Sequence, residues 1–460
     1  IVVLVLGRAR RPRLSELLLL GAFVYLGLSA RRNLALLPLV ATPILARYLT
    51  ESRARGPLGS WISRIIGQRR PLALRIAAVL AIALTLRYDL GLVLDQVYAR
   101  AETNARFGFG LAPCAYPVEA ARFVESRALP GPIFATMSAS DYLLFVRPEE
   151  KSFIDGRLEV HSEEHYARYL TMLNGGEPFH RAAREFGFRT LVLPVMDAPN
   201  LISELRHDPT WACVHVDDTA FVFARRDALP PNCAEITRES TGLRPWSGAE
   251  ATVQPGLQLP LLLDPRPIRI PWSELNRGQA MLIAGWPDLA APLFAKAANL
   301  APRIAAPRVH LGACLSQFGQ LDAAERELGW AGTLPMNHRL RAQANASWGF
   351  LHLSRNRPRE ALRAYDLALR DNPSAGERGP ALVNRGLAKF LLDDRDGAFQ
   401  DVSAGLKLVP NYLDGYRILG AIEERRGHAD AARRALEVYL RGGGTEATAR
   451  AAYQRLTRGG

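Results

Sequence analysis

Two histidines and a glutamate are spaced as in one class of metal site. The segment His161-Ser162-Glu163-Glu164-His165 matches the H-x-x-E-H pattern of inverted zinc peptidases. That chemistry needs both imidazoles on one face of a helix, with a glutamate beside the metal-bound water. Ser162 instead has the character of a helix N-cap, with Glu163 and Glu164 in the first turn. No third ligand is apparent, so we predict a helix start here, without a metal ion or cofactor.

The tripeptide Asp155-Gly156-Arg157 is a candidate ligand site. It ends a predicted strand, and ligands often bind where the strands of a parallel sheet end. The same residues also suit a tight turn, because Asp and Gly favour turn conformations. Both interpretations stay open: a ligand turn that uses Asp155 and Arg157, or a structural turn only. No paired carboxylates or phosphate-binding loop can be placed, so catalytic residues remain unknown.

Carboxamide side chains recur in the C-terminal part of the chain. Asn276 and Asn384 each lie two residues before a glycine in the sequence Asn-Arg-Gly, and Gln343 and Asn345 lie between them. An amide both donates and accepts hydrogen bonds, so these four residues could bind the backbone of an extended peptide. Nearby arginines would favour an acidic or C-terminal carboxylate end. The alternative is that the asparagines merely suit a repeat consensus and are solvated.

A repeat places these amides on helices. Five glycines recur at a nearly constant interval: Gly278, Gly312, Gly349, Gly386 and Gly420. Each is followed at the same two offsets by an alanine and then by a bulky residue, as Gly278 is followed by Ala290 and Phe294. An interval of roughly 34 residues is typical of tetratricopeptide (TPR) repeats, in which each repeat is a pair of helices. We therefore predict an all-α solenoid of five repeats and a capping helix over 272–460, which binds a protein or peptide partner.

The middle of the chain, residues 113–227, alternates short apolar strands with amphipathic helices. This order predicts an α/β domain with a small, largely parallel sheet, whose last two strands form an antiparallel hairpin at its edge. The predicted strands are Ile133–Thr136, Ser152–Asp155, Thr190–Pro194, Trp211–Val216 and Phe221–Ala224. The predicted helices are Val118–Arg127, Ser162–Leu173, Phe179–Phe186 and Asn200–Arg206. Residues 228–271 contain eight prolines and predict an extended linker.

The N-terminal part has the charge pattern of a membrane segment. Residues 1–100 hold 15 Arg, no Lys and 4 acidic residues, so they carry 11 of the 13 net positive charges. The apolar runs 14–30, 34–49 and 71–94 approach the length of about 20 residues that a spanning helix needs. Because the charge lies between these runs and not on one folded face, we predict no nucleic-acid partner.

We predict transmembrane helices within residues 1–95, with a lipid bilayer as one partner. The positive-inside rule places Arg31 and Arg32 outside and everything after about residue 95 on the outer side. The predicted location is the bacterial inner membrane, with the later domains in the periplasm. Arg31 and Arg32 would contact lipid phosphate or would snorkel to the interface. A soluble helical bundle is the alternative.

The cysteines fit an outer location but do not define a disulfide. Cys114, Cys213, Cys233 and Cys314 all follow residue 95, where disulfides could form. Cys213 and Cys233 are close enough in sequence to be linked, but spacing does not determine which cysteines pair. Buried unpaired thiols remain the alternative.

Several stretches of residues 14–227 resemble a known family. They are YPVEAARFVESRALPGPIF, SFIDGRLEV, the Gly175–Gly176 pair, FGFRTLVLP and WACVHVDDTAFVFARR, together with the apolar segment RRNLALLPLVATPILAR. They resemble the extracytoplasmic domain of bacterial multispanning proteins related to protein mannosyltransferases of the GT-C class, which use polyprenyl-phosphate sugars. The resemblance implies a catalytic carboxylate in an early outer loop, and no residue here matches it. We expect the chain to be the non-catalytic C-terminal portion of a larger membrane protein that binds a partner through its repeats. The alternative is a glycosyltransferase whose catalytic region precedes residue 1.

Overall fold

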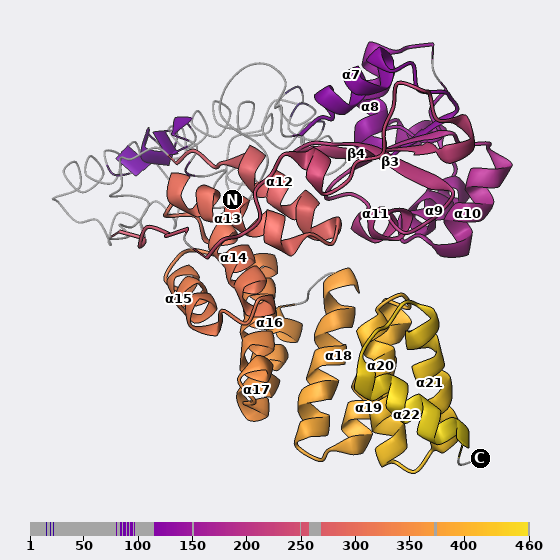
Figure 1. Cartoon of the computed structure of the whole chain (residues 1–460). Helices are drawn as coiled ribbons and strands as arrows, with labels where there is room; N and C mark the ends of the chain where they lie inside the picture. Colours follow the sequence, from indigo (N-terminus) through magenta and orange to yellow (C-terminus); the bar gives the residue numbers. More distant parts are fainter. Residues whose placement is uncertain are drawn as a thin grey trace, which may run out of the picture. The chain divides into compact units, whose positions relative to one another are not determined.

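The computed structural model of the chain divides into two units, Ile1–Arg87 and Tyr88–Gly460. The helices and strands named below all belong to the second unit (Figure 1). The described residues are single residues and short stretches between 15 and 96, then 115–149, 151–248, 250–256, 268–371 and 375–458.

The predicted fold class needs a correction at its N-terminal end. In the described part of the chain, no helix combines the length and the apolar character that crossing a membrane requires. Transmembrane helices are therefore not supported, and neither is a lipid bilayer as a partner. The run 34–49 lies outside the described residues, as do most residues of 14–30 and more than half of 71–94, and Arg31 and Arg32 also lie outside them. The fold that the structure does describe is mostly helical, with a TPR-like solenoid and one small sheet. The location in the cell stays a prediction.

The sheet of the α/β region is mixed, not largely parallel. Its four strands lie in the order β1-β2-β4-β3, with one parallel pair, β1 with β2, and two antiparallel pairs. The predicted hairpin of β3 and β4 is confirmed, with β3 at the edge. Because the hairpin folds β4 back against β2, it makes most of the sheet antiparallel. The strands are β1 (Ile133–Ala135), β2 (Thr190–Pro194), β3 (Trp211–Val216) and β4 (Ala220–Arg225).

The predicted strand Ser152–Asp155 does not form. Side chains occupy its backbone acceptors: the Ser152 hydroxyl donates to the Ile154 carbonyl, and the His165 ring contacts the Phe153 carbonyl at 2.7 Å. A carbonyl that is bonded locally is lost to a sheet ladder, so this segment is coil.

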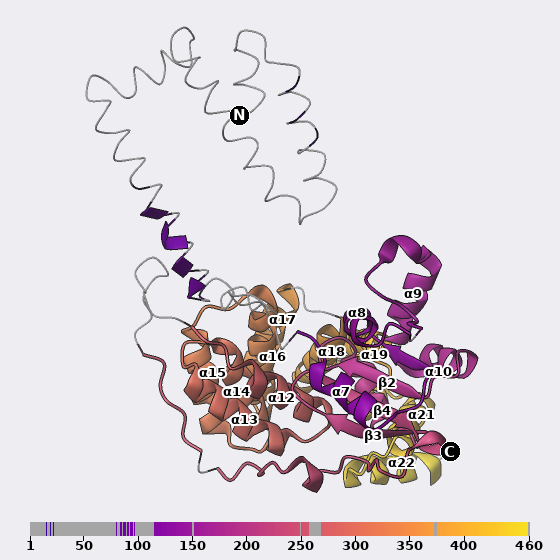
Figure 2. The ribbon, with the colours of Figure 1, turned by 90° about the horizontal axis from the view of Figure 1, so that it is seen from above.

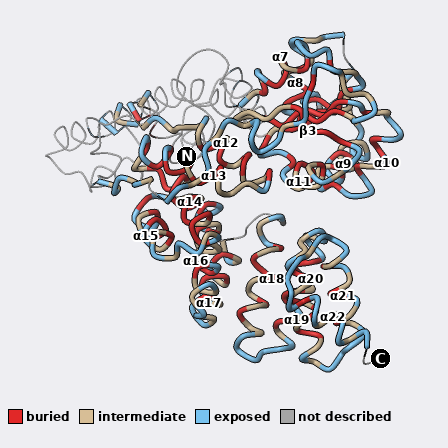
Figure 3. Tube along the Cα trace, viewed as in Figure 1, coloured by how far each residue is buried: buried red, intermediate tan, exposed pale blue. Residues whose placement is uncertain are grey.

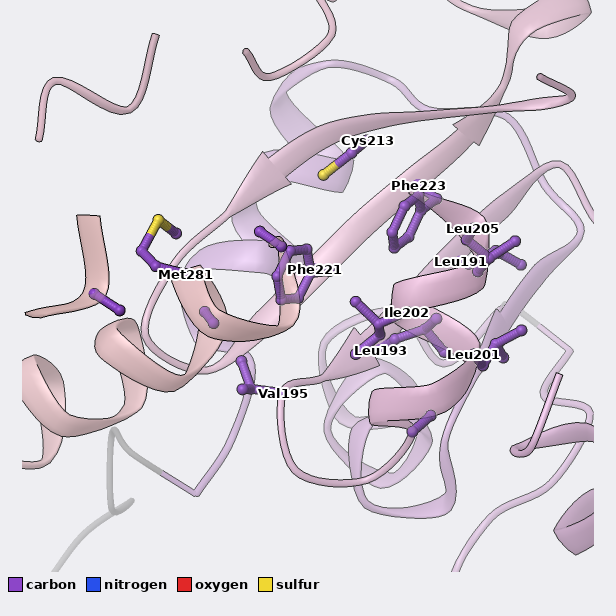
Figure 4. Packing of buried hydrophobic residues seen from close by; sticks show 14 of the residues in the cluster. Leu191, Leu193, Val195, Leu201, Ile202, Leu205, Cys213, Phe221, Phe223 and Met281 are labelled. Atoms are coloured by element: carbon purple, nitrogen blue, oxygen red, sulfur yellow. The ribbon is translucent and has the colours of Figure 1, made fainter. Parts of the chain in front are cut away.

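Helices cover both faces of the sheet (Figure 1). Because side chains alternate along a strand, Val222 of β4 packs toward α7 and α8, while Phe221 and Phe223 pack toward α9, α10 and α11. The buried cluster that contains Phe221 and Phe223 continues into the first repeat and includes Met281 there (Figure 4). The helices are α7 (Val118–Ser126), α8 (Met137–Val146), α9 (Glu163–Met172), α10 (Gly176–Glu185) and α11 (Pro199–Leu205), with 3-10 turns η2 (Leu158–Val160), η3 (Arg226–Ala228) and η4 (Glu239–Thr241).

Between 268 and 458 the chain forms successive helix pairs (Figure 1), which confirms the TPR-repeat prediction. The first helices of the pairs are α12 (Trp272–Ile283), α14 (Ala305–Gln317), α16 (His338–Ser354), α18 (Ala375–Leu391) and α20 (Leu413–Arg425). The second helices are α13 (Pro287–Leu300), α15 (Leu321–Gly332), α17 (Pro358–Arg370), α19 (Arg395–Leu408) and α21 (Ala429–Arg441), and α22 (Ala447–Arg458) follows.

The repeated glycines let the two helices of each pair approach closely. A Cβ placed on Gly278 would lie 2.5 Å from the Phe294 ring, and one on Gly349 would lie 2.7 Å from the Tyr365 ring. The other three glycines face their predicted bulky partners in the same way, at 2.6–2.7 Å: Leu328, Val402 and Leu436. The buried residues accordingly run along the inner faces of the pairs (Figure 3). The constant spacing between each glycine and its bulky residue thus reflects a direct contact between the two helices of a pair.

Tyr365 offers a test of this packing. Its ring is buried against Gly349, and its hydroxyl has no hydrogen-bond partner among the described residues. We expect Tyr365→Phe to raise the free energy of unfolding by about 1 kcal/mol, because a buried polar group without a partner costs about 1–3 kcal/mol. Thermal unfolding of the full chain measures the change.

Tyr439 is the matched control for Tyr365. It is also buried, but its hydroxyl accepts a hydrogen bond from the Glu446 backbone N–H at 3.4 Å. Tyr439→Phe should therefore give no gain. A loss of stability in Tyr365→Phe would show that its hydroxyl is satisfied after all.

Candidate functional site

The histidine segment is a helix start, as predicted. The Ser162 side chain caps α9 by accepting a hydrogen bond from the His165 backbone N–H at 3.1 Å. The rings of His161 and His165 stack 5.5 Å apart, but they serve different partners. His161 lies 3.5 Å from the Asp155 carboxylate, whereas His165 contacts the Phe153 carbonyl. Among the described residues, no group of three or more His, Cys, Asp or Glu side chains is placed to hold a metal ion.

Asp155 and Arg157 bind each other across a tight turn. One Asp155 oxygen accepts from the Arg157 backbone N–H at 2.9 Å, and the other accepts from the guanidinium at 2.7 Å. Asp155 is buried, and the hydrogen bond from the Arg157 side chain is the main reason that its pKa is lowered to about 2. The Asp155 carboxylate is thus taken up by Arg157 and by the nearby His161, whereas the Arg157 side chain is 67% exposed. The ligand role of Asp155 and Arg157 stays a prediction.

The pairing predicts how stability depends on pH. A carboxyl whose pKa is lower in the folded state stabilises the fold above its unfolded pKa of about 3.9. That contribution is lost as the pH falls from about 4 toward 2, and a shift of this size corresponds to about 2 kcal/mol. We expect Asp155→Asn to lower the thermal midpoint at pH 7 and to match the wild type near pH 2. A difference that stays constant over this range would contradict the prediction.

The predicted peptide-binding amides do not form one set. Asn276 is only 6% exposed, which leaves little of its amide for a partner. Gln343 on α16 donates to Glu377 of the next first helix, α18, at 2.5 Å, and Arg339 pairs with the same carboxylate at 3.2 Å. Asn345 follows Gln343 by two residues, which is about 200° around a helix, so the two amides project in different directions.

Asn384 lies beside Tyr412. Burial raises the pKa of the Tyr412 hydroxyl, and a hydrogen bond with the Asn384 side chain opposes that shift. The neighbouring Arg385 is not free for an acidic ligand. It binds Asp401 through two nitrogens at 2.7 Å each and Asp366 at 2.9 Å. Arg385 therefore joins α18 to α17 and α19.

Exposed apolar residues share a face with two of the amides. Phe350 follows Gly349 directly and is 36% exposed, while Leu391 lies five residues after Gly386 and is 49% exposed. Positions one and five residues after the packing glycine lie about 40° apart on a helix, so they form one face. By the same register, this face of α16 and α18 holds Gln343, Phe350, Asn384, Leu387 and Leu391, and we call it the first-helix face.

The first-helix face belongs to two helices that contact each other, α16 and α18. Its apolar members were not predicted as site residues, although the glycine register contains the signal. Each packing glycine faces the second helix of its own pair, so the residue after it lies about 100° away around the helix, beside the interface and not within it. This rule identifies Phe350 and Leu387 from the sequence.

The described cysteines are unpaired thiols. Cys213 and Cys233 are both buried and free, as is Cys314. Burial raises the pKa of Cys213 to about 11 and that of Cys314 to about 12, so neither is a thiolate near neutral pH. The structure thus contains the buried thiols and not the disulfide.

No family model matches the chain, and no curated protein is significantly similar to it. Solved structures with a similar fold include a chain of the APC/C hetero-tetramer Cut9–Hcn1 (18% identity, TM-score 0.37, 40% of this chain). The chain spans only 36% of the length of that protein. Others are YrrB, described as a TPR protein with an unusual peptide-binding site (15% identity, TM-score 0.30, 40% of this chain, 91% of YrrB), and TTC0263, a TPR protein of Thermus thermophilus (20% identity, TM-score 0.32, 40% of this chain, 97% of TTC0263). None of these three is described as a glycosyltransferase, and the comparisons do not show the resemblance to protein mannosyltransferases.

Proposed function

We propose that this chain is a protein-interaction protein whose repeats bind an extended segment of a partner protein on the first-helix face. The observation that carries the proposal is the exposure of Phe350 and Leu391 on two helices that contact each other, on the same face as Gln343 by helical register. Exposed apolar residues that gather on one surface are typical of interaction sites. A TPR solenoid is a binding surface and supplies no chemistry of its own.

The face favours a partner with apolar side chains over an acidic one. Phe350 and Leu391 offer apolar contact area. Gln343 and Asn384 lie on the same face, and the parts of their amides that do not bind Glu377 or Tyr412 are left for a peptide backbone. Arg385 is already paired with carboxylates, so it adds little charge for a ligand. Apolar anchors in the partner, spaced along an extended backbone, would match this arrangement.

The proposal can be tested with a peptide library displayed on phage and selected on the full chain. We expect enriched peptides to lose at least tenfold in affinity for Leu391→Asp, because a charge would enter the apolar contact. Asn384→Ala should cost about 1–3 kcal/mol in binding, since it leaves a desolvated peptide group unpaired. Calorimetry with a selected peptide measures both effects.

The matched control is Leu367→Asp. Leu367 is 42% exposed, close to the value for Leu391, but it lies on a second helix, α17. Its replacement should leave peptide affinity unchanged. If Leu367→Asp and Leu391→Asp weaken binding equally, or if no peptide is enriched, the first-helix face is not the binding site.

A further inference from the structure

A short piece of the linker is held against the repeats as an extended peptide. This piece, residues 250–256, is here called the strap. It lies along the first two repeats (Figure 2), and its contacts are with Asn299 at the end of α13, Arg308 in α14 and Glu327 in α15. None of these three residues lies on the first-helix face.

Asn299 binds the strap backbone on both sides of Thr252. Its amide nitrogen donates to the Ala251 carbonyl at 2.9 Å, and its amide oxygen accepts from the Val253 N–H at 2.7 Å. Such two-point pairing requires an extended backbone, because only then do these two groups point the same way. This is the interaction predicted for the other asparagines of the repeats, and here it is made at Asn299.

Arg308 and Glu327 complete the contact. The Arg308 guanidinium donates to the Val253 carbonyl and, at 2.9 Å, to Glu327. The second Glu327 oxygen accepts from the Thr252 hydroxyl. Arg308 is fully buried and Glu327 is 1% exposed, and Arg308 also lies over the Trp330 ring. A buried ion pair is a poor source of net stability, so its use to orient donors and acceptors toward a peptide is the better explanation.

The strap contributes almost no side chains to this contact. Val253 is 57% exposed and Ala251 is exposed, and the Glu250 side chain binds Ser247 rather than the repeats. The strap side chain that contacts the three repeat residues is that of Thr252, through its hydroxyl. Recognition through the backbone and one hydroxyl does not depend on the rest of the sequence. Release of the strap breaks the hydrogen bonds to Asn299, Arg308 and Glu327, and a second extended segment of the same chemistry can form them again, which makes the strap exchangeable.

We propose that Asn299, Arg308 and Glu327 form a second peptide site, which binds an extended segment with Thr or Ser at its middle position. The strap occupies the site in cis, and a partner segment of the same chemistry replaces it. This site is separate from the first-helix face and does not depend on the function proposed for that face.

The probe is a fluorescent peptide with the sequence of residues 247–256, added to the full chain. In the wild type it competes with a tethered strap, whose effective concentration is of the order of mM. Val253→Pro removes the strap N–H that Asn299 accepts. We expect this variant to bind the peptide at least tenfold more tightly than the wild type. Val253→Ala keeps the N–H and loses only an exposed side chain, so it should bind like the wild type.

Two further measurements identify the site. Asn299→Ala added to Val253→Pro should weaken peptide binding at least tenfold, whereas Leu391→Asp added to Val253→Pro should not change it. A peptide with Ser in place of Thr252 should bind like the original, and one with Val should bind at least fivefold more weakly. Circular dichroism confirms that each variant is folded, and Thr252→Val, which is nearly isosteric, replaces Val253→Pro if the latter is not.

The proposal is overturned if Val253→Pro and Val253→Ala bind the peptide equally, or if Asn299→Ala has no effect on its affinity. Loss of binding in Leu391→Asp would place the peptide on the first-helix face instead.

Discussion

Phe294→Ala is expected to lower the free energy of unfolding by about 3–5 kcal/mol. Phe294 is fully buried in α13, and its ring fills the space that Gly278 leaves open on α12. Removing the ring leaves a cavity, because Gly278 has no side chain that could move into it. The lost contacts are those that hold the two helices of the first repeat together. Urea unfolding followed by circular dichroism measures the loss.

Leu300→Ala is the control for this experiment. Leu300 ends the same helix, but it is 59% exposed, so its removal should change stability by no more than about 0.5 kcal/mol. Hydrogen exchange should show the Phe294→Ala effect strongest in α12, α13 and the adjoining α14, because each repeat contacts only its neighbours. An equal loss in the two variants would refute the packing role of Phe294.

The repeats could be predicted in detail because their signal is local and recurs. A glycine followed at a fixed interval by a bulky residue describes a single contact between the helices of one pair, and Gly386 and Val402 make that contact as Gly278 and Phe294 do. The helix start at Ser162 was predictable for the same reason, since the cap and the bonded N–H of His165 lie within one turn.

The features that were not predicted depend on contacts between distant residues. The sequence of β4 does not predict that this strand lies between β2 and β3. That order makes the sheet mostly antiparallel. The strap site joins Val253 to Asn299 and Arg308, which are 46 and 55 residues away in sequence. Asn299 was not among the predicted amides, and only the fold shows that it faces an extended backbone.

Glu327→Ala is expected to cost about 3–5 kcal/mol, because it leaves a buried charge without its partner. The remaining guanidinium of Arg308 is fully buried, and burial already lowers its pKa while Glu327 opposes that shift. The variant also removes the acceptor of the Thr252 hydroxyl, so it should loosen the strap. Hydrogen exchange in α14 and α15, measured by mass spectrometry, reports the local loss of stability.

Glu325→Ala separates the effect of burial from that of charge. Glu325 lies on the same helix and also pairs with an arginine, Arg355, at 2.7 Å, but its side chain is 45% exposed. An exposed ion pair contributes about 0–1 kcal/mol, so this variant should change little. Equal losses for Glu325→Ala and Glu327→Ala would mean that burial of Arg308 is not what makes the pair matter.

Replacing both partners distinguishes stability from recognition. Arg308→Met combined with Glu327→Leu removes both charges and keeps similar volumes, so it should restore most of the stability that Glu327→Ala loses. Placed in the Val253→Pro background, the same double variant has no group left to bind the Val253 carbonyl or the Thr252 hydroxyl, so the peptide of residues 247–256 should bind at least tenfold more weakly to it than to Val253→Pro alone. Recovered stability without recovered peptide binding would show that the buried pair is kept for recognition. Recovery of both stability and peptide binding would leave Asn299 as the sole determinant of the strap site. Recovery of neither would mean that the ion pair of Arg308 and Glu327 stabilises the repeat outright.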